Sequence, residues 1–289
     1  MRTFVIIPTV GRAACVRDTV KWLERQSRKP DGIVVVGVNP DDIEGVASAT
    51  SLPVEACLWL IGSSSQRNHG LDLVEGRADI VLFLDDDFVP QPDYIEKMVG
   101  VFEEQPDIVG ITGRMIEDGI HGAGISFENA VRMLERDVAP AAPKMEPRKG
   151  LYGCNMALRM AAVGDIRFDE RLKLYGWQED IDFSFQVGKR GRMVKYDGIG
   201  GVHMGIKRGR TSGIRFGYSQ IANPVYLLGK GTIPRNRAYR IMWRNVASNI
   251  TRSLHPERHV DRRGRLWGNM LALRDLIVGR IRPERILEF

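Results

Sequence analysis

The sequence predicts an α/β fold, a largely parallel sheet flanked by helices, followed by a basic and mainly helical C-terminal region. Short apolar runs without polar alternation recur in the first 84 residues, which is typical of strands buried on both faces of a parallel sheet. Stretches of helical length separate these runs, as in βαβ units. Residues 204–289 hold 18 Lys and Arg against 5 Asp and Glu, so charge also divides the chain.

The N-terminal elements are expected to alternate between strand and helix. The run 4–8 (FVIIP) predicts the first strand, and a turn at 9–12 leads from it into a helical stretch that ends near residue 26. The remaining elements of this part are expected as strands at 32–38, 58–61 and 80–84 and as helices at 63–75 and 93–104.

The middle of the chain is expected to be less regular. Several glycines and the proline-rich run 139–150 interrupt the segment 113–153, which predicts a mobile loop. Long irregular loops in compact domains are often binding loops or lids. Order is expected to return at 152–159, and a strand over 195–202 leads to His203.

Composition limits the class of protein. A chain of 289 residues with 43% hydrophobic content can bury one large core or a core with an appendage. The three cysteines form no CxxC pair, which fits a reducing, cytoplasmic setting. The apolar run near the N-terminus is shorter than the core of a secretion signal, and no run approaches the roughly 18 apolar residues of a membrane span.

The most informative stretch is the acidic cluster Asp85, Asp86 and Asp87, which directly follows the apolar run 80–84. In open α/β sheets the carboxyl ends of the strands border the crevice in which ligands bind. Three adjacent carboxylates repel one another and are costly to desolvate unless a cation or water compensates them. The cluster therefore predicts a site for a hard divalent metal, with a solvated acidic turn as the alternative.

A second acidic cluster, Glu179, Asp180 and Asp182, is expected before or at the start of a helix. The helix dipole favours carboxylates in the first turn, so capping is the structural explanation. Capping accounts for one carboxylate better than for three, which indicates a further role for this cluster.

The order of these motifs resembles family 2 glycosyltransferases of GT-A fold. The similarity covers residues 1–205 and is carried by the DDD strand end, RN, GCNMALR, WQEDIDFSFQVGKRG and HMG. Members of that family transfer a sugar from a nucleoside diphosphate to an acceptor hydroxyl, usually with inversion and a divalent metal. The resemblance implies a GT-A nucleotide-sugar-binding and catalytic domain at 1–205 and leaves 206–289 as a basic amphipathic helical region.

The resemblance also implies which residues bind a metal, expected to be Mn²⁺ or Mg²⁺. Asp87 looks like the carboxylate ligand, and His203 falls where the family often places a second ligand. A metal bridging the pyrophosphate oxygens would stabilise the charge that grows on the leaving group. For His203, an ordinary position in the core or at the surface is the alternative.

Donor binding is expected at the turn after the first strand and on the helix that carries the RN pair. The residues concerned are Pro8, Thr9, Arg12 and Arg67, of which Arg67 would pair with the pyrophosphate or the base, unless it is only a surface helix residue. By similarity with the family's DXD motif, Asp85 or Asp86 would contact the ribose or a metal-bound water, with Asp86 the better ribose candidate.

The residue that reads the nucleotide base is the main departure from the family pattern. The family usually closes the second strand with an aspartate that reads uracil, whereas this chain has Asn39-Pro40-Asp41-Asp42. Asn39 or Asp41 could substitute. Uridine, thymidine and guanosine therefore all stay open as the nucleoside.

The acceptor side is expected to involve the second acidic cluster. By resemblance, Asp180 would be the general base that takes the proton of the acceptor hydroxyl, and Glu179 would orient the acceptor or backbone groups. Trp177 would stack on a sugar ring, with core packing as the alternative, and Tyr152 and Asn155 are expected to contact the acceptor.

The basic C-terminal region predicts an anionic partner. Two apolar stripes at helical spacing, 242, 246, 250 and 254, then 266, 270, 273, 277 and 281, are accompanied by arginines. Such helices can lie on anionic membranes, and packing on the catalytic domain is equally consistent with the pattern. No nucleic-acid motif is recognisable, so binding to nucleic acid is not expected. Association with a second copy stays open.

The sequence therefore predicts a metal-dependent, inverting glycosyltransferase that acts on a saccharide or lipid-linked saccharide in cell-envelope polysaccharide or glycolipid assembly. It would be cytoplasmic or peripheral on the inner face of the membrane. A sugar-phosphate nucleotidyltransferase is the nearest rival, but PTVGRAACVR lacks the glycine- and lysine-bearing phosphate loop of that class. An aspartate-nucleophile phosphatase would normally carry its DxD at the first strand. A non-catalytic binding protein of the same fold is the rival from a different class.

Overall fold

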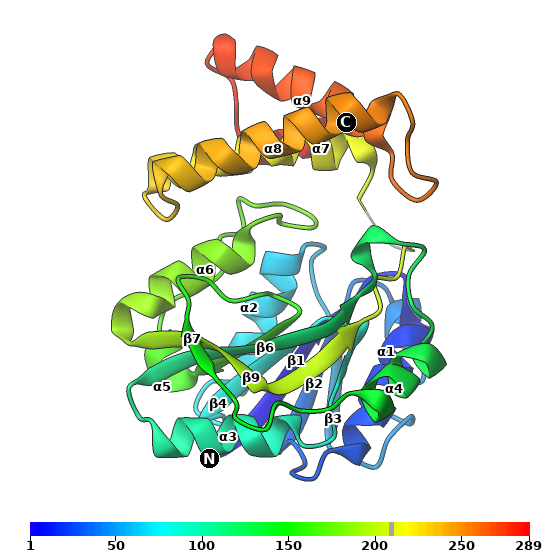
Figure 1. Cartoon of the computed structure of the whole chain (residues 1–289), viewed down its shortest axis with the longest axis vertical. Helices are drawn as coiled ribbons and strands as arrows, with labels where there is room; N and C mark the ends of the chain where they lie inside the picture. Colours follow the sequence, from blue (N-terminus) through cyan, green and yellow to red (C-terminus); the bar gives the residue numbers. More distant parts are fainter. Residues whose placement is uncertain (208–210) are drawn as a thin grey trace. The chain divides into compact units, whose positions relative to one another are not determined.

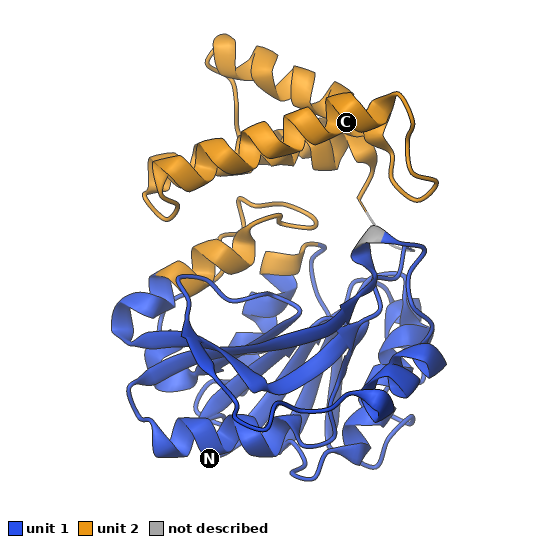
Figure 2. Cartoon of the chain, viewed as in Figure 1, with its two compact units in different colours: residues 1–61, 65–167, 186–209 blue, residues 62–64, 168–185, 210–289 orange. Residues whose placement is uncertain are grey.

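A computed structural model describes residues 1–207 and 211–289. The chain forms two compact units, coloured separately in Figure 2. The first contains residues 1–61, 65–167 and 186–209, and the second contains residues 62–64, 168–185 and 210–289. The segment 168–185 thus belongs to the same unit as the C-terminal helices. The expected division of the chain near residue 205 stays a prediction.

The first unit is an α/β structure built on one nine-stranded sheet (Figure 1). Its strands follow the order β3-β2-β1-β4-β8-β6-β9-β5, and β7 pairs with β9. The strands are β1 Thr3–Pro8, β2 Gly32–Gly37, β3 Val54–Leu58, β4 Ile80–Leu84, β5 Phe88–Pro90, β6 Ile108–Asp118, β7 Met145–Pro147, β8 Asn155–Arg159 and β9 Arg192–His203. The predicted α/β class is confirmed.

The four N-terminal strands, β1 to β4, are parallel, which decides where the site lies. Ile6 pairs with Phe83 and Pro8 pairs with Val36, so β1, β2 and β4 end at the same edge of the sheet. Every residue of β2 and β4 is buried, as expected for strands covered on both faces. The remaining part of the sheet is mixed, because β8 runs antiparallel to β4 and β6, while β6 and β9 are parallel.

The helices of this unit cover the sheet. They are α1 Ala13–Trp22, α2 Ser63–Val74, α3 Tyr94–Glu104, α4 Phe127–Arg136 and α5 Met160–Val163, with short 3-10 turns η1 Leu23–Arg25, η2 Pro40–Asp42, η3 Gly119–His121 and η4 Gly188–Arg190. Gly70 lets α2 pack directly on β1, because a Cβ there would lie 2.5 Å from Cγ2 of Ile6. Met98, Val99 and Phe102 of α3 are buried.

Two expectations about local structure are wrong. The third strand is Val54–Leu58 and not 58–61, because β3 pairs with β2 through those residues, while Trp59, Leu60 and Ile61 lie exposed beyond its end. The segment 113–153 is also more regular than expected. It contains the end of β6, which pairs with β9, and the amphipathic helix α4, whose N-cap is Ser126.

The second unit is helical. It contains α7 Gly213–Lys230, α8 Arg235–Ser253, α9 Arg262–Ile277 and the 3-10 turn η5 Pro283–Glu288, together with most of α6 Glu179–Val187. The predicted helical character of the C-terminal region is confirmed. Among the described helices, none has the length and apolar character needed to cross a membrane.

Candidate active site

The acidic cluster occupies the connection between β4 and β5. Asp85 to Asp87 follow the last residue of β4, and Phe88 begins β5, which pairs antiparallel with the end of β9. This pairing sets Phe88 opposite His203, so residues more than a hundred positions apart in sequence meet at the sheet edge. The predicted pairing of the acidic cluster with His203 is thus explained by strand register.

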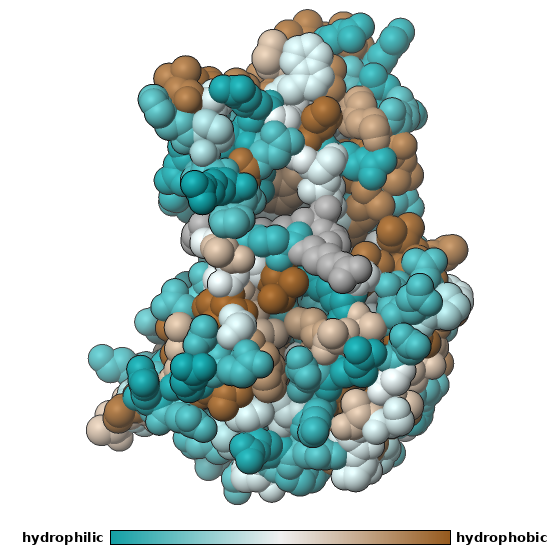
Figure 3. All heavy atoms as spheres, turned by 90° about the vertical axis from the view of Figure 1, so that its right-hand side faces the viewer, coloured by the Kyte–Doolittle hydropathy of each residue, from teal (hydrophilic) through white to brown (hydrophobic). Residues whose placement is uncertain are grey.

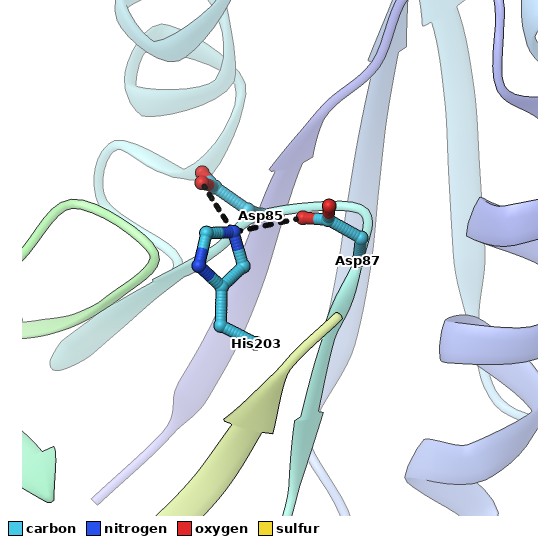
Figure 4. Close-up of side chains that lie close together, drawn as sticks. All are labelled: Asp85, Asp87 and His203. Carbon is cyan, nitrogen blue, oxygen red and sulfur yellow. Dashed lines mark ion pairs between the residues drawn. The ribbon is translucent and has the colours of Figure 1, made fainter. Parts of the chain in front are cut away.

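Asp85, Asp87 and His203 converge on one point (Figure 4). One ligand atom from each lies within 4.8 Å of the other two. Nε2 of His203 is 3.2 Å from Oδ1 of Asp87 and 4.0 Å from Oδ2 of Asp85. Two carboxylates and one imidazole form a donor set that suits Mn²⁺ and related divalent ions.

The carboxylates around His203 stabilise a positive charge on its imidazole ring. Burial acts to lower the pKa of His203, but hydrogen bonds to Asp118 and Asp87 outweigh it and raise that pKa to about 10. Burial acts to raise the pKa of Asp87, and His203 with Arg12 outweighs it, so that this pKa falls to about 2. The carboxylates therefore favour a cationic charge here, which is the electrostatic requirement of a metal site.

Asp118 orients the histidine and was missed by sequence reasoning. Nδ1 of His203 donates a hydrogen bond to Oδ1 of Asp118 over 2.9 Å, and the hydroxyl of Tyr152 donates to the other oxygen over 3.1 Å. A carboxylate on the far nitrogen of a metal-binding histidine fixes its tautomer and ring orientation. The only sequence signal was an acidic residue ending an apolar strand, inside a segment expected to be irregular.

Asp86 points away from this cluster. Its carboxylate is buried and accepts hydrogen bonds from the hydroxyl of Thr9 over 2.7 Å and from Nη1 of Arg12 over 2.8 Å. Its backbone carbonyl accepts a bond from the hydroxyl of Thr19 over 2.7 Å. Burial raises the pKa of Asp86, while Arg12 favours the charged form. Asp86 therefore ties the strand end to β1 and α1, and the more exposed Asp85 faces the metal cluster.

Arg67 is a buried residue of α2 and not a surface helix arginine. Its Nη2 lies 2.9 Å from Oδ1 of Asp85 and 3.3 Å from the carbonyl of Gly153, and its guanidinium lies 6.0 Å from the ring centroid of Phe83. Arg12 on the other side lies 3.5 Å from Asp87 as well as bonding Asp86. Two arginines thus flank the acidic strand end.

The turns after β1 and β2 are organised by Asp42, which was also not assigned a role from the sequence. Its buried carboxylate accepts hydrogen bonds from the backbone amides of Gly11, Val38 and Asn39. Asn39 and Asp41, the two candidates for reading the base, are exposed beside it. The expected donor residues therefore border one end of the sheet, and the reading of the base by Asn39 or Asp41 stays a prediction.

The predicted acceptor residues lie in different places. Tyr152 contacts the metal cluster through Asp118, whereas Asn155 is fully buried inside the sheet and its side-chain oxygen accepts a hydrogen bond from Thr112. Such a position does not reach an acceptor, so we do not retain Asn155 in the candidate site. Trp177 belongs to the second unit, where its ring lies edge-on to Phe216 and its carbonyl accepts a bond from Asn223.

Glu179 and Asp180 form the first turn of α6 in the second unit, as expected. Glu179 is buried and accepts a hydrogen bond from the hydroxyl of Ser63 over 3.4 Å. Asp180 is half-buried. Gln178, directly before this turn, has a φ of 75°, a left-handed conformation that costs energy for a residue other than glycine. Such conformations cluster at functional sites.

Comparison with known proteins agrees with the fold and the motifs. A curated relative from Haloferax volcanii, a glucosyl-dolichyl phosphate glucuronosyltransferase, is 30% identical over 167 residues, which are 55% of this chain. The chain thus spans about half of that relative, 53% of its length.

Two solved structures of glycosyltransferases share the fold. Staphylococcus aureus TarS, residues 1–349 with UDP-GlcNAc, matches with a TM-score of 0.56 and 18% identity over 99% of this chain and 83% of that one. The mannosyltransferase PcManGT of Pyrobaculum calidifontis with GDP-Man and Mn²⁺ matches with a TM-score of 0.53 and 15% identity over 99% and 84%. The GT-A fold expected from the sequence is therefore confirmed.

The match to a family model covers the strands around the acidic cluster but not β9, which carries His203, or α6. Residues 4–166 match the model named glycosyl transferase family 2. They extend from β1 through the acidic cluster and β8 to just beyond α5, and this stretch is more than half of the chain. The chain belongs to glycosyl transferase family 2.

Proposed function

We propose that this protein transfers a sugar from a nucleoside diphosphate sugar to a saccharide or lipid-linked saccharide, with inversion at the sugar carbon and with a divalent cation held by Asp85, Asp87 and His203. The convergence of these three side chains is the observation that carries the proposal. Bound there, Mn²⁺ or Mg²⁺ would neutralise charge on the pyrophosphate leaving group.

The donor would lie along the sheet edge formed by the ends of β1, β2 and β4. Arg12 and Arg67 supply fixed positive charge beside the acidic cluster, which suits a pyrophosphate. Since Asp86 is buried against Thr9 and Arg12, we assign the ribose or metal-bound water to Asp85, and we assign Asp86 to holding the turn that faces the donor. Pro8 ends β1 at this edge, and Asn39 is proposed to face the base.

The acceptor hydroxyl must lose a proton as it attacks. We propose that the carboxylate of Asp180 accepts this proton. A positioned general base typically raises the reaction rate by about 10²- to 10⁴-fold. Glu179 and Trp177 are proposed to orient the acceptor, the latter by stacking on a sugar ring, and Tyr152 is proposed to border it. The strained φ of Gln178, immediately before this turn, supports a functional role for the loop.

The relatives support the two proposed substrate classes. The Haloferax relative is named for transfer to glucosyl-dolichyl phosphate, which supports a lipid-linked acceptor and a role in cell-envelope glycan assembly. The two solved structures contain UDP-GlcNAc and GDP-Man, so they support a nucleotide sugar and leave the base open. A cytoplasmic setting stays a prediction.

Binding of donor nucleotides tests the proposal. Calorimetry with UDP, GDP and dTDP, each with and without Mn²⁺, is expected to show Mn²⁺-dependent binding of at least one of them. Screening the matching nucleotide sugars for thermal stabilisation would then identify the sugar. If none of the nucleotides binds in the presence of Mn²⁺, the proposed function is wrong, and binding without transfer to any acceptor would favour a non-catalytic protein.

A further inference from the structure

The C-terminal helices pack through glycines and polar side chains. A Cβ on Gly217 of α7 would lie 2.0 Å from the backbone oxygen of Arg265 in α9, and a Cβ on Gly268 would lie 2.1 Å from that of Ile214. Such contact of two helix backbones, here with Gly213 and Gly217 four residues apart, resembles the small-xxx-small packing of helices in lipid. Where the two backbones meet in this way, no room is left for a large side chain at Gly217 or Gly268.

Buried hydrogen bonds join the same helices. The side-chain amide of Asn249 in α8 donates to Gln220 and to Asn269, over 2.8 Å in each case. The hydroxyl of Tyr218 donates to Asp275 over 2.9 Å beside a small apolar cluster. Asn249, Asn269 and Asp275 are all buried. Polar groups thus fill positions that large apolar side chains usually occupy in a helical bundle in water.

The apolar side chains of α8 lie largely outside instead. Tyr239, Trp243, Ile250 and Leu254 follow the spacing i, i+4, i+11 and i+15, which places them on one side of the helix. All four are exposed, Trp243 by 73% and Leu254 by 75%. Of the stripe expected from the sequence, only Met242 and Val246 face the neighbouring helices.

A second exposed row lies on α9. Met270, Leu273 and Ile277 are exposed, with Trp267 beside them, and Ile277 reaches 86%. The two rows meet at a hollow of about 370 Å³ that is lined by Ser253 and Leu254 at the end of α8 and by Arg263, Leu266, Trp267 and Met270 of α9. The side of this unit visible in Figure 3 has hydrophobic side chains at the surface among hydrophilic ones. Exposed apolar surface of this extent marks an interaction site.

Uncompensated positive charge accompanies the apolar rows. Arg240 and Arg244 of α8 and Arg274 of α9 are exposed, and no carboxylate of the described residues lies within ion-pair distance of them. The excess of 18 cations over 5 anions across 204–289 makes contact between two copies of this face unfavourable. The charge instead complements an anionic surface.

We propose that the outer face of α8 and α9 binds an anionic lipid bilayer, with both helices lying in the plane of the interface. Tyr239, Trp243 and Trp267 have the amphipathic rings that favour the headgroup level of a membrane. Arginines beside an inserted apolar face attract acidic lipids. This inference does not rest on the proposed glycosyl transfer.

Sedimentation of the full-length chain with lipid vesicles tests the proposal. Vesicles of phosphatidylcholine with 30% phosphatidylglycerol are expected to bind the protein at least tenfold more tightly than pure phosphatidylcholine vesicles. The variant Arg240→Gln/Arg244→Gln is expected to partition about 30-fold more weakly, since it removes two cations from the face. Arg132→Gln/Arg136→Gln on α4 is a matched control, because this exposed pair has the same spacing and loses the same charge.

The apolar row is tested separately. Trp243→Ser/Trp267→Ser is expected to weaken binding at least tenfold and to abolish the blue shift of tryptophan fluorescence on vesicles, while Val138→Gln, an exposed apolar residue of the first unit, changes neither. Unchanged melting temperatures show that the variants fold. Equal binding to both vesicle types, or equal binding of wild type and the tryptophan variant, would overturn the proposal. The proposal would also be overturned if the wild type were a dimer without lipid and the tryptophan variant a monomer, since a second copy would then cover this face.

Discussion

Nδ1 of His203 donates its hydrogen bond to Asp118 over 2.9 Å, and this contact leaves Nε2 to face Asp87, 3.2 Å away. The two carboxylates come from two different strands on either side of His203, since Asp118 ends β6 and Asp87 precedes β5, and both of these strands pair with β9. The carboxylate of Asp118 therefore sets which nitrogen is available for a metal.

Asp118→Asn is expected to weaken Mn²⁺ binding by about 10- to 100-fold, the usual effect of losing the carboxylate behind a histidine ligand. An asparagine keeps the size of the side chain but removes the charge that favours this tautomer. Mn²⁺ titration by calorimetry or electron paramagnetic resonance measures the change. Glu117→Gln, the neighbouring residue on β6, serves as the control, and equal losses in the two variants would contradict the orienting role of Asp118.

Asp87→Ala is expected to abolish Mn²⁺-dependent nucleotide binding, because it removes a buried carboxylate that faces both His203 and Arg12. The measurement is the difference in nucleotide affinity with and without Mn²⁺. Glu104→Gln, an exposed carboxylate at the end of α3, is expected to leave that difference unchanged. Retention of the Mn²⁺ effect in the Asp87 variant would place the metal elsewhere.

Asp180→Asn is expected to lower the turnover number by about 10²- to 10⁴-fold while the donor binds with unchanged affinity, because only the proton acceptor is lost. Steady-state kinetics with the identified donor and acceptor, combined with donor titration, separates the two effects. Asp165→Asn, an exposed carboxylate, should match the wild type. A parallel loss of donor affinity in the Asp180 variant would assign this residue to binding and not to proton transfer.

The parts of the fold that the sequence predicts best are those set by local pattern. β2 and β4 are buried throughout, as is β1 except for Pro8, and their sequences are mostly apolar, so their character shows without knowledge of their neighbours. The sequence did not predict β6, because its hydrogen-bonding partners are β8 and β9, which follow it by dozens of residues. Tertiary pairing of that kind overrides glycines that would otherwise indicate a loop.

The residues of the candidate site also fall into those that a local motif predicts and those that only the tertiary structure reveals. Asp85, Asp87 and His203 could be found from residue type and motif order, whereas Asp118 and Asp42 act through hydrogen bonds to distant backbone or side-chain atoms. The sequence also does not predict the direction in which a side chain points. Asp86 and Asn155 lie in the expected motifs, yet their side chains turn into the protein because Thr9, Arg12 and Thr112 bind them there.

Gly217→Ala is expected to lower the stability of the helical unit by about 1–3 kcal/mol, since overpacking in a close contact forces backbones apart. The added Cβ would meet backbone atoms of Arg265, which cannot rotate away as a side chain does. Gly229→Ala provides the matched control on the same helix, because no atom lies within 4 Å of a Cβ there, and alanine in a helix is favoured over glycine by about 0.5–1 kcal/mol. Thermal unfolding followed by circular dichroism should therefore shift in opposite directions for the two variants. A shift in the same direction for both would mean that α7 and α9 are not held by backbone contact at Gly217.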